Sequence, residues 1–469
     1  MQIQPKLTVS GYRGIWGKSL NHDIVEDYTK AFIKFVKENI NENPTILLAR
    51  DGRESGPEIK ETIIKTLFCL GLHYIDGDIL PTPTVLFSVH EHKYDSAIII
   101  TASHNPREYN GLKFVTNKAL FTSEEEVEKI KENYKQIIDN KKFSFNAFIC
   151  KILPTNNLFD ANLPTIKSSH LNFNHEHADQ ILKHIDVEKI RSHKFKVAVD
   201  MINASACILD PYLFKQLGVE LIPLNNIPNG KFAHTPEPIK ENLTEIAKVV
   251  KENNCNIGFA QDPDADRLVV INEKGEILSE EYTLALGAEA ILSKNPNNNI
   301  VVNMSTSRMS NDIAIKYGGK CIRTKVGEAN VVAGIINNNA IMGGEGGGGI
   351  IYPTINMARD SFVSLALILE LLAERNQSIS VCVDSLPKYI IRKDKLPIQG
   401  NLEDMYSSIK SHFKYAMVNE IDGLRLDFSD SSWFHLRPSN TEPIIRLYGE
   451  AKTQERIEEL FEEIKKLIG

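Results

Sequence analysis

Short runs of apolar residues alternate with amphipathic segments along most of the chain. Residues 45–49 and 96–101 are mainly apolar and have the length of buried strands, whereas residues 57–70 and 124–139 repeat apolar positions with a helical period. Strands that alternate with helices are typical of α/β layers. We therefore predict an α/β fold class for this part of the chain.

The alternation restarts after a polar stretch near residues 140–174, and the end of the chain differs from the rest. Residues 423–427 and 433–436 alternate as strands between two helical segments, which indicates a smaller α+β unit. We expect four domains, of which the first three are α/β. The expected boundaries are residues 1–150, 151–256, 257–376 and 377–469.

The composition is that of a globular protein. The chain has 469 residues, 54 Lys and Arg against 61 Asp and Glu, a formal net charge of −7 and 42% hydrophobic residues. These values exclude a disordered chain and argue against a general nucleic-acid or membrane-surface binder, because such binders gather Lys and Arg on one face. An anionic substrate is not excluded, since the net charge does not determine the field inside one cleft.

No segment has the pattern of a signal peptide or a membrane span. The first six residues lack an apolar core, and the most hydrophobic stretch, residues 362–373, contains Glu370. The six cysteines are widely scattered and show no metal-binding spacing. We therefore expect an unexported protein of the reducing cytoplasm.

Four polar segments carry candidate chemistry, and the first is TASHNP at residues 101–106, with Lys113 ten positions after Ser103. It follows an expected strand, and ligands bind at the carboxyl ends of strands in open α/β sheets. A serine-hydrolase elbow would need glycine at positions 101 and 105, so acyl transfer is disfavoured. Turn hydrogen bonds by Ser103 and Asn105 are the structural alternative.

The second segment is DPDADR at residues 262–267, which places three aspartates at alternate positions. Carboxylates held this close oppose each other's ionisation, and a divalent cation relieves the repulsion. Mg²⁺ prefers oxygen ligands and often shares its shell with a phosphate. A calcium-binding loop would need glycine at its sixth position, where Arg267 stands. A solvated acidic turn remains the structural alternative.

The third segment is GGEGGGG at residues 343–349, which formally contains the GxGxxG pattern. A dinucleotide fingerprint must open a helix, whereas the extended residues 350–353 follow here. Glu345 stands alone among six glycines, which indicates a carboxylate on backbone that a ligand can approach closely. A flexible turn is the alternative.

The fourth segment is RPSNTEP at residues 437–443, followed by Arg446. A guanidinium, two hydroxyls, an amide and several backbone N–H groups in one turn form a phosphate cradle. A capped helix start would explain Ser439 and Thr441 but would leave Arg437 without a role.

In this order, the four segments resemble those of the α-D-phosphohexomutases, the family of phosphoglucomutase, phosphomannomutase and phosphoglucosamine mutase. SGYRG at 10–14, PTP at 81–83, TKVG at 324–327 and DG at 422–423 also match in similar places. The resemblance implies four domains around a central active-site cleft, with mixed sheets in the first three. It also implies a Mg²⁺-dependent phosphomutase, an isomerase that exchanges hexose 6-phosphate and hexose 1-phosphate through a phosphoserine and a hexose 1,6-bisphosphate.

The resemblance assigns a role to each matching residue. Ser103 would carry the phosphoryl group and, with three aspartates, hold Mg²⁺. His104 and Lys113 would assist proton transfer. The metal-binding aspartates would be Asp262, Asp264 and Asp266, with Arg13 and Arg267 stabilising charge. The substrate would be bound by Thr324, Gly327, Glu345, Gly347, Arg437, Ser439, Asn440, Thr441 and Arg446.

Two positions of the third segment depart from the family pattern. Many relatives have Ser or Asn at the position of Gly347 and His at the position of Gly349, so one side-chain contact and one candidate proton carrier are missing. Glycine at the second position is similar to archaeal-type and Bacteroidetes-type members, often glucosamine or mannose/glucose enzymes. Which residue replaces the histidine is left open.

We predict a phosphohexomutase with a preference for glucosamine phosphate, and mannose or glucose phosphate as alternatives. The expected partners are the phosphorylated hexose and a hexose 1,6-bisphosphate activator, without nucleic acid or membrane, in a monomer or homodimer. A catalytically silent sugar-phosphate-binding protein and a metal-dependent phosphatase are the alternatives from other classes.

Overall fold

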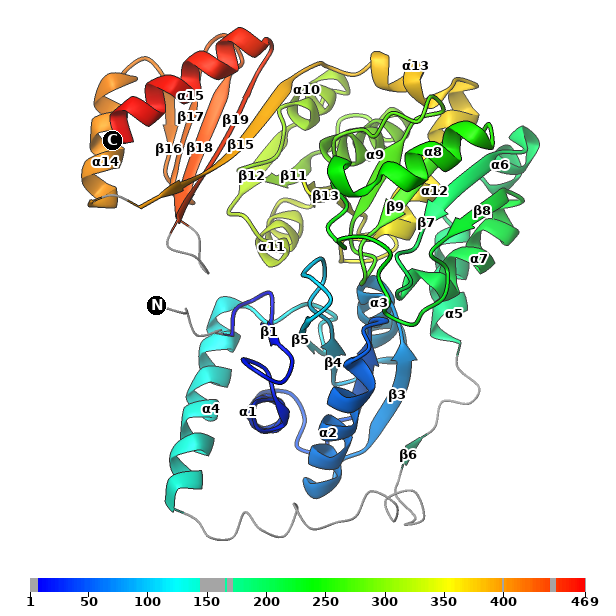
Figure 1. Cartoon of the computed structure of the whole chain (residues 1–469), viewed down its shortest axis with the longest axis vertical. Helices are drawn as coiled ribbons and strands as arrows, with labels where there is room; N and C mark the ends of the chain where they lie inside the picture. The colour runs from blue at the N-terminus through cyan, green and yellow to red at the C-terminus, as the bar shows by residue number, and fades with distance from the viewer. Residues whose placement is uncertain (1–6, 144–164, 167–171, 399, 439–443, 469) are drawn as a thin grey trace.

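Four β-sheets with their helices build the chain, as Figure 1 shows for the computed structural model. The structure describes residues 7–143, 165–166, 172–398, 400–438 and 444–468. Three of the sheets mix parallel and antiparallel strands, and the fourth is antiparallel. The predicted fold class, three α/β domains and a smaller C-terminal α+β domain, is therefore confirmed.

The first sheet has the strand order β1-β5-β4-β2-β3-β6 and is buried on both faces. In β4, Ala97 and Ile99 enter one hydrophobic core, whereas Ile98 and Ile100 enter the other, which is why this strand is continuously apolar. The elements are β1 (Tyr12–Ile15), α1 (His22–Asn39), β2 (Ile46–Arg50), α2 (Gly56–Cys69), β3 (Tyr74–Ile79), α3 (Thr82–His92), β4 (Ser96–Ile100), β5 (Tyr109–Thr116), α4 (Glu124–Phe143) and β6 (Thr165–Ile166).

The second sheet has the order β10-β9-β7-β8. Its last two strands follow residue 256, where we expected a domain boundary, but β9 pairs with β7 and β10 pairs with β9. We therefore propose that the boundary lies after β10, because a boundary at residue 257 would divide this sheet. The elements are α5 (Phe173–Leu182), α6 (Val187–His193), β7 (Lys196–Asp200), α7 (Ala206–Leu217), β8 (Glu220–Leu224), η3 (Lys240–Asn242), α8 (Thr244–Glu252), β9 (Ile257–Gln261) and β10 (Leu268–Ile271).

The third sheet has the order β12-β11-β13-β14 and shares one hydrophobic core with the second. Phe214 of α7, Leu286 of α9 and Leu367 of α12 all belong to this core. The elements are α9 (Glu281–Lys294), β11 (Ile300–Asn303), α10 (Met309–Lys316), β12 (Cys321–Thr324), α11 (Glu328–Asn338), β13 (Met342–Glu345), β14 (Gly349–Ile351), α12 (Ser361–Arg375) and α13 (Ile379–Asp384).

The fourth sheet has the order β15-β19-β18-β17-β16, and two amphipathic helices pack against it (Figure 1). Its core is separate from the others and includes Phe413, Phe434 and Phe461. The elements are β15 (Ile390–Pro397), α14 (Leu402–His412), β16 (Met417–Asn419), β17 (Leu424–Asp427), β18 (Trp433–Pro438), β19 (Ile444–Ala451) and α15 (Gln454–Ile468).

The start of helix α3 docks the first domain onto the loop between β9 and β10. The Thr82 N–H donates to the Asp264 carbonyl oxygen at 2.9 Å, and the Asn356 side chain donates to the Pro83 carbonyl oxygen at 2.8 Å. His177 continues this contact, because its Nδ1 lies 3.0 Å from the Thr84 hydroxyl. The start of α3 is thereby held by residues of both the second and the third domain.

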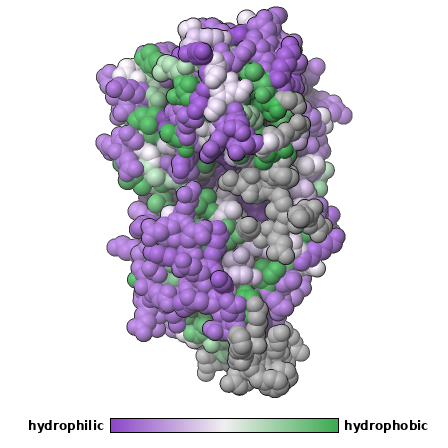
Figure 2. Space-filling model, turned by 90° about the vertical axis from the view of Figure 1, so that its left-hand side faces the viewer, coloured by the Kyte–Doolittle hydropathy of each residue, from purple (hydrophilic) through white to green (hydrophobic). Residues whose placement is uncertain are grey.

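The surface drawn in Figure 2 is mainly hydrophilic, and its hydrophobic residues lie in small, separate groups. Among the described helices, none has the length and apolar composition needed to cross a bilayer.

Candidate active site

Ser103 lies in the loop that follows β4, almost completely buried. Its hydroxyl donates to Asp262 Oδ2 at 3.0 Å and lies 3.2 Å from His104 Nδ1. Its backbone adopts a positive φ of 51°, and its N–H donates to the Thr101 hydroxyl at 2.9 Å. A non-glycine residue in this region is strained, so the surrounding contacts hold the hydroxyl against the acidic loop.

Arg53 fixes the backbone of the serine loop, and it was not among the residues predicted from the sequence. The side chain is fully buried, and its Nε donates to Asp51 Oδ2 at 3.1 Å. The local signal is the segment Arg-Asp-Gly-Arg at residues 50–53, which begins at the end of β2 and has the composition of a turn. The guanidinium donates to four carbonyl oxygens, those of Ser103 at 2.6 Å, Asn105 at 2.7 Å, Pro106 at 2.7 Å and Tyr109 at 2.9 Å.

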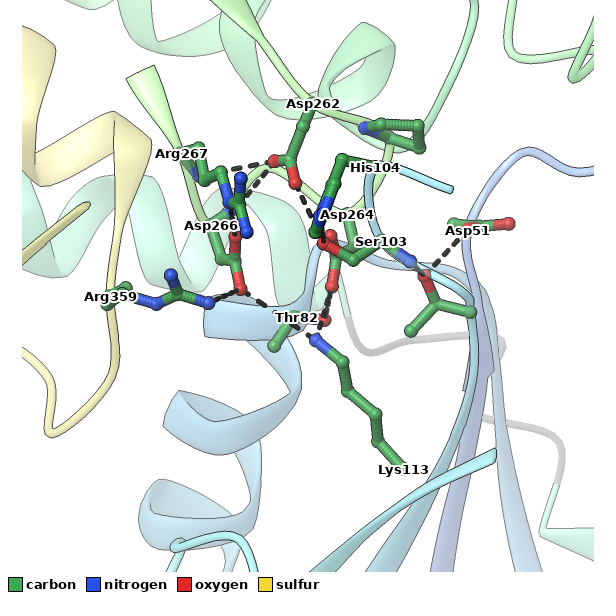
Figure 3. Close-up of polar contacts among 12 residues, drawn as sticks. Asp51, Thr82, Ser103, His104, Lys113, Asp262, Asp264, Asp266, Arg267 and Arg359 are labelled. Carbon is green, nitrogen blue, oxygen red and sulfur yellow. Dashed lines mark hydrogen bonds and ion pairs between the residues drawn. The ribbon is translucent and has the colours of Figure 1, made fainter. Parts of the chain in front are cut away.

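The three aspartates of the β9–β10 loop converge as the sequence predicted. Asp262, Asp264 and Asp266 are fully buried and offer carboxylate oxygens within 4.8 Å of one another. Figure 3 shows them facing Ser103 and Lys113. The strand β10 follows directly and pairs antiparallel with β9, which excludes a calcium loop that enters a helix.

The charges in this cluster are those that a divalent cation would balance. Burial and the carboxylates of Asp266 and Asp264 raise the pKa of Asp262 well above its usual value. Burial opposes ionisation of Asp264 as well, but the ammonium of Lys113 lowers the pKa of Asp264 below its usual value. Within the described part of the chain, Asp264 Oδ1 and Asp266 Oδ1 are buried without a hydrogen bond. These unpaired oxygens fit a hard cation such as Mg²⁺.

Three of the predicted catalytic residues, Lys113, Arg13 and Arg267, lie around the aspartates. Lys113 Nζ, on β5, is 2.7 Å from Asp264 Oδ2 and 3.8 Å from Asp266 Oδ2. Arg13, on β1, donates to Asn105 Oδ1 at 3.0 Å. The Arg267 N–H donates to Asp262 Oδ1 at 3.2 Å. Neither Nε atom donates a hydrogen bond among the described residues, although the Arg267 Nε lies 3.9 Å from Asp266 Oδ1, so both N–H groups can donate to an anion.

His104 is uncharged in this environment. The Arg267 guanidinium, burial and the Arg13 guanidinium lower the pKa of His104 far below its usual value. The neutral imidazole lies beside the Ser103 hydroxyl, and the two guanidinium groups oppose its protonation.

The glycine-rich segment forms the hairpin β13–β14, so the dinucleotide pattern was correctly rejected. Glu345 ends β13, and its Oε1 accepts from Asn303 Nδ2 at 2.9 Å and from the Gly327 N–H at 2.8 Å. Gly347 faces Arg267, since a Cβ there would lie 4.0 Å from the Arg267 Cζ. The Thr324 hydroxyl donates to the Lys325 carbonyl oxygen at 3.1 Å and not to Glu345.

Glu281, at the start of α9, lies directly beneath the glycine-rich segment 343–349, which we call the sugar loop after the role that the resemblance implies. A Cβ on Gly346 would come within 2.0 Å of the Glu281 Oε1, and Oε2 accepts from the Ser307 N–H at 2.9 Å. Burial raises the pKa of Glu281 to about 8. The carboxyl group is therefore protonated and compact at neutral pH.

Arg359 is a second residue that sequence reasoning missed. It precedes α12 and forms ion pairs with Asp266, Glu328 and Glu345. Nothing in the local sequence marks it, because its partner Asp266 is 93 residues away. Asp266 lies in the β9–β10 loop, residues 262–267, which we call the metal loop.

Arg437 and Arg446 form a second cluster in the C-terminal domain. They stand opposite each other on β18 and β19 and line a small cavity of about 30 Å³ together with Ser305 and His435. Adjacent like charges repel, so this pair favours a bound anion. Asp422 Oδ2 lies 3.7 Å from Arg437 Nη1. The predicted cradle residues Ser439, Asn440 and Thr441 lie outside the described residues.

Family models cover nearly all of the chain. Those for phosphoglucomutase/phosphomannomutase match residues 5–141 (alpha/beta/alpha domain I), 175–275 (domain II), 279–389 (domain III) and 398–467 (C-terminal domain). The chain belongs to the phosphoglucomutase/phosphomannomutase family. The resemblance that the four motifs indicated is thereby confirmed.

Relatives of this family align over their whole length. The "Phosphoglucomutase/phosphomannomutase" of Thermococcus kodakarensis is 32% identical over 455 residues, which cover 96% of each chain. The "Phosphoglucosamine/phosphogalactosamine mutase" of Sulfurisphaera tokodaii is 33% identical over 467 residues, which cover 98% of each chain.

Solved structures of family members share the fold. The crystal structure of a Burkholderia thailandensis phosphoglucomutase/phosphomannomutase family protein, 27% identical, superposes with a TM-score of 0.81 and covers 100% of this chain and 97% of that one. An Aspergillus fumigatus N-acetylphosphoglucosamine mutase, 14% identical with a TM-score of 0.55 over 93% of this chain and 85% of that one, was solved with GlcNAc-6P and magnesium.

We expect Arg53→Met to destabilise the first domain by about 3–5 kcal/mol, because it leaves a buried carboxylate and four carbonyl groups without their donor. Urea unfolding followed by Trp16 fluorescence, in a Trp433→Phe background, measures the loss. Arg107→Met is the matched control, since its exposed pair with Glu54 contributes at most about 1 kcal/mol. Equal losses in the two variants would contradict the assigned role of Arg53.

Asp264→Asn is expected to weaken Mn²⁺ binding, measured by calorimetry, by at least about tenfold, because even indirect support of a metal site is worth that much. Mg²⁺-dependent activity should be lost with it. Asp430→Asn, which alters a surface ion pair with Arg456, should leave Mn²⁺ binding unchanged. Unaltered affinity in Asp264→Asn, or full activity in chelator, would refute the metal site.

Glu281→Gln should remove a pH dependence of stability. Between the ordinary pKa of 4.5 and the raised pKa of about 8, the folded chain holds a proton on Glu281 that the unfolded chain has released. Stability therefore falls by about 1.4 kcal/mol per pH unit as the pH rises through this window. Thermal unfolding from about pH 5 to pH 8 should show a steeper decline in the unmodified protein than in Glu281→Gln. Glu280→Gln, the neighbouring control, should keep the decline.

Proposed function

We propose that the chain interconverts hexose 6-phosphate and hexose 1-phosphate through a phosphorylated Ser103 and a hexose 1,6-bisphosphate intermediate. The observation that carries this proposal is the 3.0 Å contact between the Ser103 hydroxyl and Asp262. It places the group that would be phosphorylated against a buried acidic cluster with cationic side chains on its other sides. Phosphoryl transfer needs such positioning and charge neutralisation more than covalent help.

Asp262, Asp264 and Asp266 would hold Mg²⁺, together with an oxygen of the phosphorylated Ser103. Mg²⁺ supplies charge neutralisation to the transferring phosphoryl group. Arg13 and Arg267 would stabilise the same group through their guanidinium Nε atoms, which donate no hydrogen bond among the described residues. The cluster therefore offers carboxylate oxygens to the cation and guanidinium N–H groups to the phosphoryl group.

His104 and Lys113 are proposed to move the proton of the attacking hydroxyl. A phosphoryl group on Ser103 would offset the two guanidinium groups that keep His104 neutral, which would raise its proton affinity. Lys113, 2.7 Å from Asp264, would be released as the aspartate shares its charge with a cation. These two residues are our candidates for the role of the histidine that is absent at Gly349.

The substrate must be bound in two orientations, because its 1- and 6-positions exchange places during turnover. Glu345 would bind the sugar hydroxyls, and Arg437 and Arg446 would bind the phosphate that is not transferred, with Ser439, Asn440 and Thr441. Thr324, Gly327 and Gly347 would line the path between them. A fixed phosphate cradle and a single sugar carboxylate can accept both orientations.

Glucosamine phosphate is the proposed substrate, with mannose and glucose phosphates as alternatives. Two observations support an amino sugar. Relatives named for glucosamine phosphate align over nearly all of this chain. Among the described residues, Arg359 is the one cation that forms an ion pair with Glu328 or Glu345, which leaves negative charge for an ammonium group. We propose a cytoplasmic monomer or homodimer, consistent with the absence of disulfides among the five described cysteines.

Ser103→Ala is expected to lower mutase turnover by at least about 10³-fold in the presence of a 1,6-bisphosphate activator, because the nucleophile is removed. Intact-protein mass of the unmodified enzyme should show one phosphate, which Ser103→Ala should lack. Undiminished turnover would sink the proposal, and an unphosphorylated inactive protein would favour a silent sugar-phosphate binder. Release of inorganic phosphate faster than isomerisation would favour a phosphatase. A panel of hexose 1-phosphates compared by kcat/KM identifies the sugar.

A further inference from the structure

Arg359 connects the loop between β9 and β10, the start of α11 and the hairpin β13–β14. Its Nη2 contacts Asp266 of the metal loop, its Nε lies 3.0 Å from Glu328 Oε2, and its Nη1 lies 3.2 Å from Glu345 Oε2. Its own N–H also donates to Glu328 Oε1 at 3.0 Å. One guanidinium thereby uses all of its nitrogen atoms on three carboxylates.

The backbone before α12 fixes the base of this side chain. Asp360 caps α12 by accepting from the N–H groups of Phe362 and Val363 at 3.0 and 3.1 Å. Asp360 Oδ2 also lies 2.9 Å from His177 Nε2, in fully buried surroundings. The backbone of Arg359 is therefore fixed, and its planar guanidinium group loses little conformational entropy when it binds the carboxylates.

The sugar loop is shaped around Arg359. A Cβ on Gly349 would lie 2.7 Å from the Arg359 Cδ and 2.8 Å from its Cβ. Only glycine leaves room for this side chain, which gives a physical reason for the glycine at a position where many relatives have a larger residue. The position of the Arg359 side chain therefore depends on glycine at position 349.

The charges around Arg359 make it a shared counterion. Asp266, Glu328 and Glu345 all pair with its one positive charge, and its side chain is only 11% exposed. Lys113 Nζ and Arg267 Nε lie farther from Asp266, at 3.8 and 3.9 Å, and neither Glu328 nor Glu345 forms another ion pair among the described residues. A cation that binds at Asp266 draws charge from the Asp266–Arg359 pair and leaves Arg359 more strongly paired with Glu345. Asp266 and Glu345 therefore compete for the guanidinium group of Arg359.

We propose that Arg359 is a positioning residue that couples the metal loop to the sugar loop, so that the state of Glu345 sets cation affinity at Asp266. This inference rests on the proposed function for the meaning of the two loops. Its direct consequence is that removing the charge of Glu345 strengthens the Arg359–Asp266 pair and weakens cation binding.

A double-mutant cycle on Mn²⁺ affinity tests the coupling. Glu345→Gln should raise the Mn²⁺ Kd, measured by calorimetry without sugar, by about threefold to tenfold, and in an Arg359→Lys background this effect should fall to less than about twofold. Lysine keeps the positive charge but cannot span three carboxylates. Arg375→Lys, also on the α12 segment but paired with Glu289, is the matched control and should leave the effect of Glu345→Gln intact.

An equal effect of Glu345→Gln with Arg359 or Lys at this position would overturn the coupling. If Arg359→Lys fails to fold by circular dichroism, Glu328→Gln replaces it: freeing one arm of Arg359 should raise the Mn²⁺ Kd by about threefold, and an unchanged Kd would equally overturn the proposal. Because Mn²⁺ binding does not depend on turnover, failure of the cycle is distinguishable from retained turnover in Ser103→Ala, which would refute the proposed function alone.

Discussion

Three carboxylates buried within 4.8 Å of one another are the constraint around which the active site is organised. In water such a cluster would separate, and in the interior it is tolerated only where positive charge is close. Lys113 reaches it from β5, Arg13 from β1 and Arg359 from the segment before α12. The first domain supplies two of these cations and also the Thr82 hydroxyl, which donates to Asp264 Oδ2 at 2.7 Å. Docking of the first domain onto the β9–β10 loop is therefore partly an electrostatic requirement of that acidic loop.

Much of this site could be predicted from the sequence, because its ligands lie in short segments with a recognisable chemical pattern. Alternate aspartates, a serine after an apolar strand and a lone glutamate among glycines each have a physical meaning that does not depend on the fold. The C-terminal cradle was partly predictable as well, since Arg437 and Arg446 flank one short polar segment of the sequence.

The residues that hold those ligands in place could not be predicted. Arg53 contacts carbonyl groups about fifty residues later, and such backbone acceptors leave no trace in the side-chain pattern. Arg359 meets carboxylates 93 and 31 residues away, so only the folded chain brings them together. The pattern of apolar residues does not assign β10 to a sheet for a similar reason: an antiparallel edge strand has the same apolar pattern whether it ends one sheet or begins another.

The hydrophobic core that continues from the second sheet into the third has a mechanical consequence. Two sheets that share their interior cannot tilt against each other without exposing apolar side chains, so these two domains form one solid block. The fourth domain has its own core and meets this block through polar contacts, among them Val326 N–H to Asp422 Oδ2 at 2.8 Å. The neighbouring Gly327 N–H holds Glu345. A rotation of the C-terminal domain would therefore displace the dipeptide Val326–Gly327, which also donates a hydrogen bond to Glu345. Movement of the phosphate cradle is in this way linked to the position of the carboxylate proposed to bind the sugar.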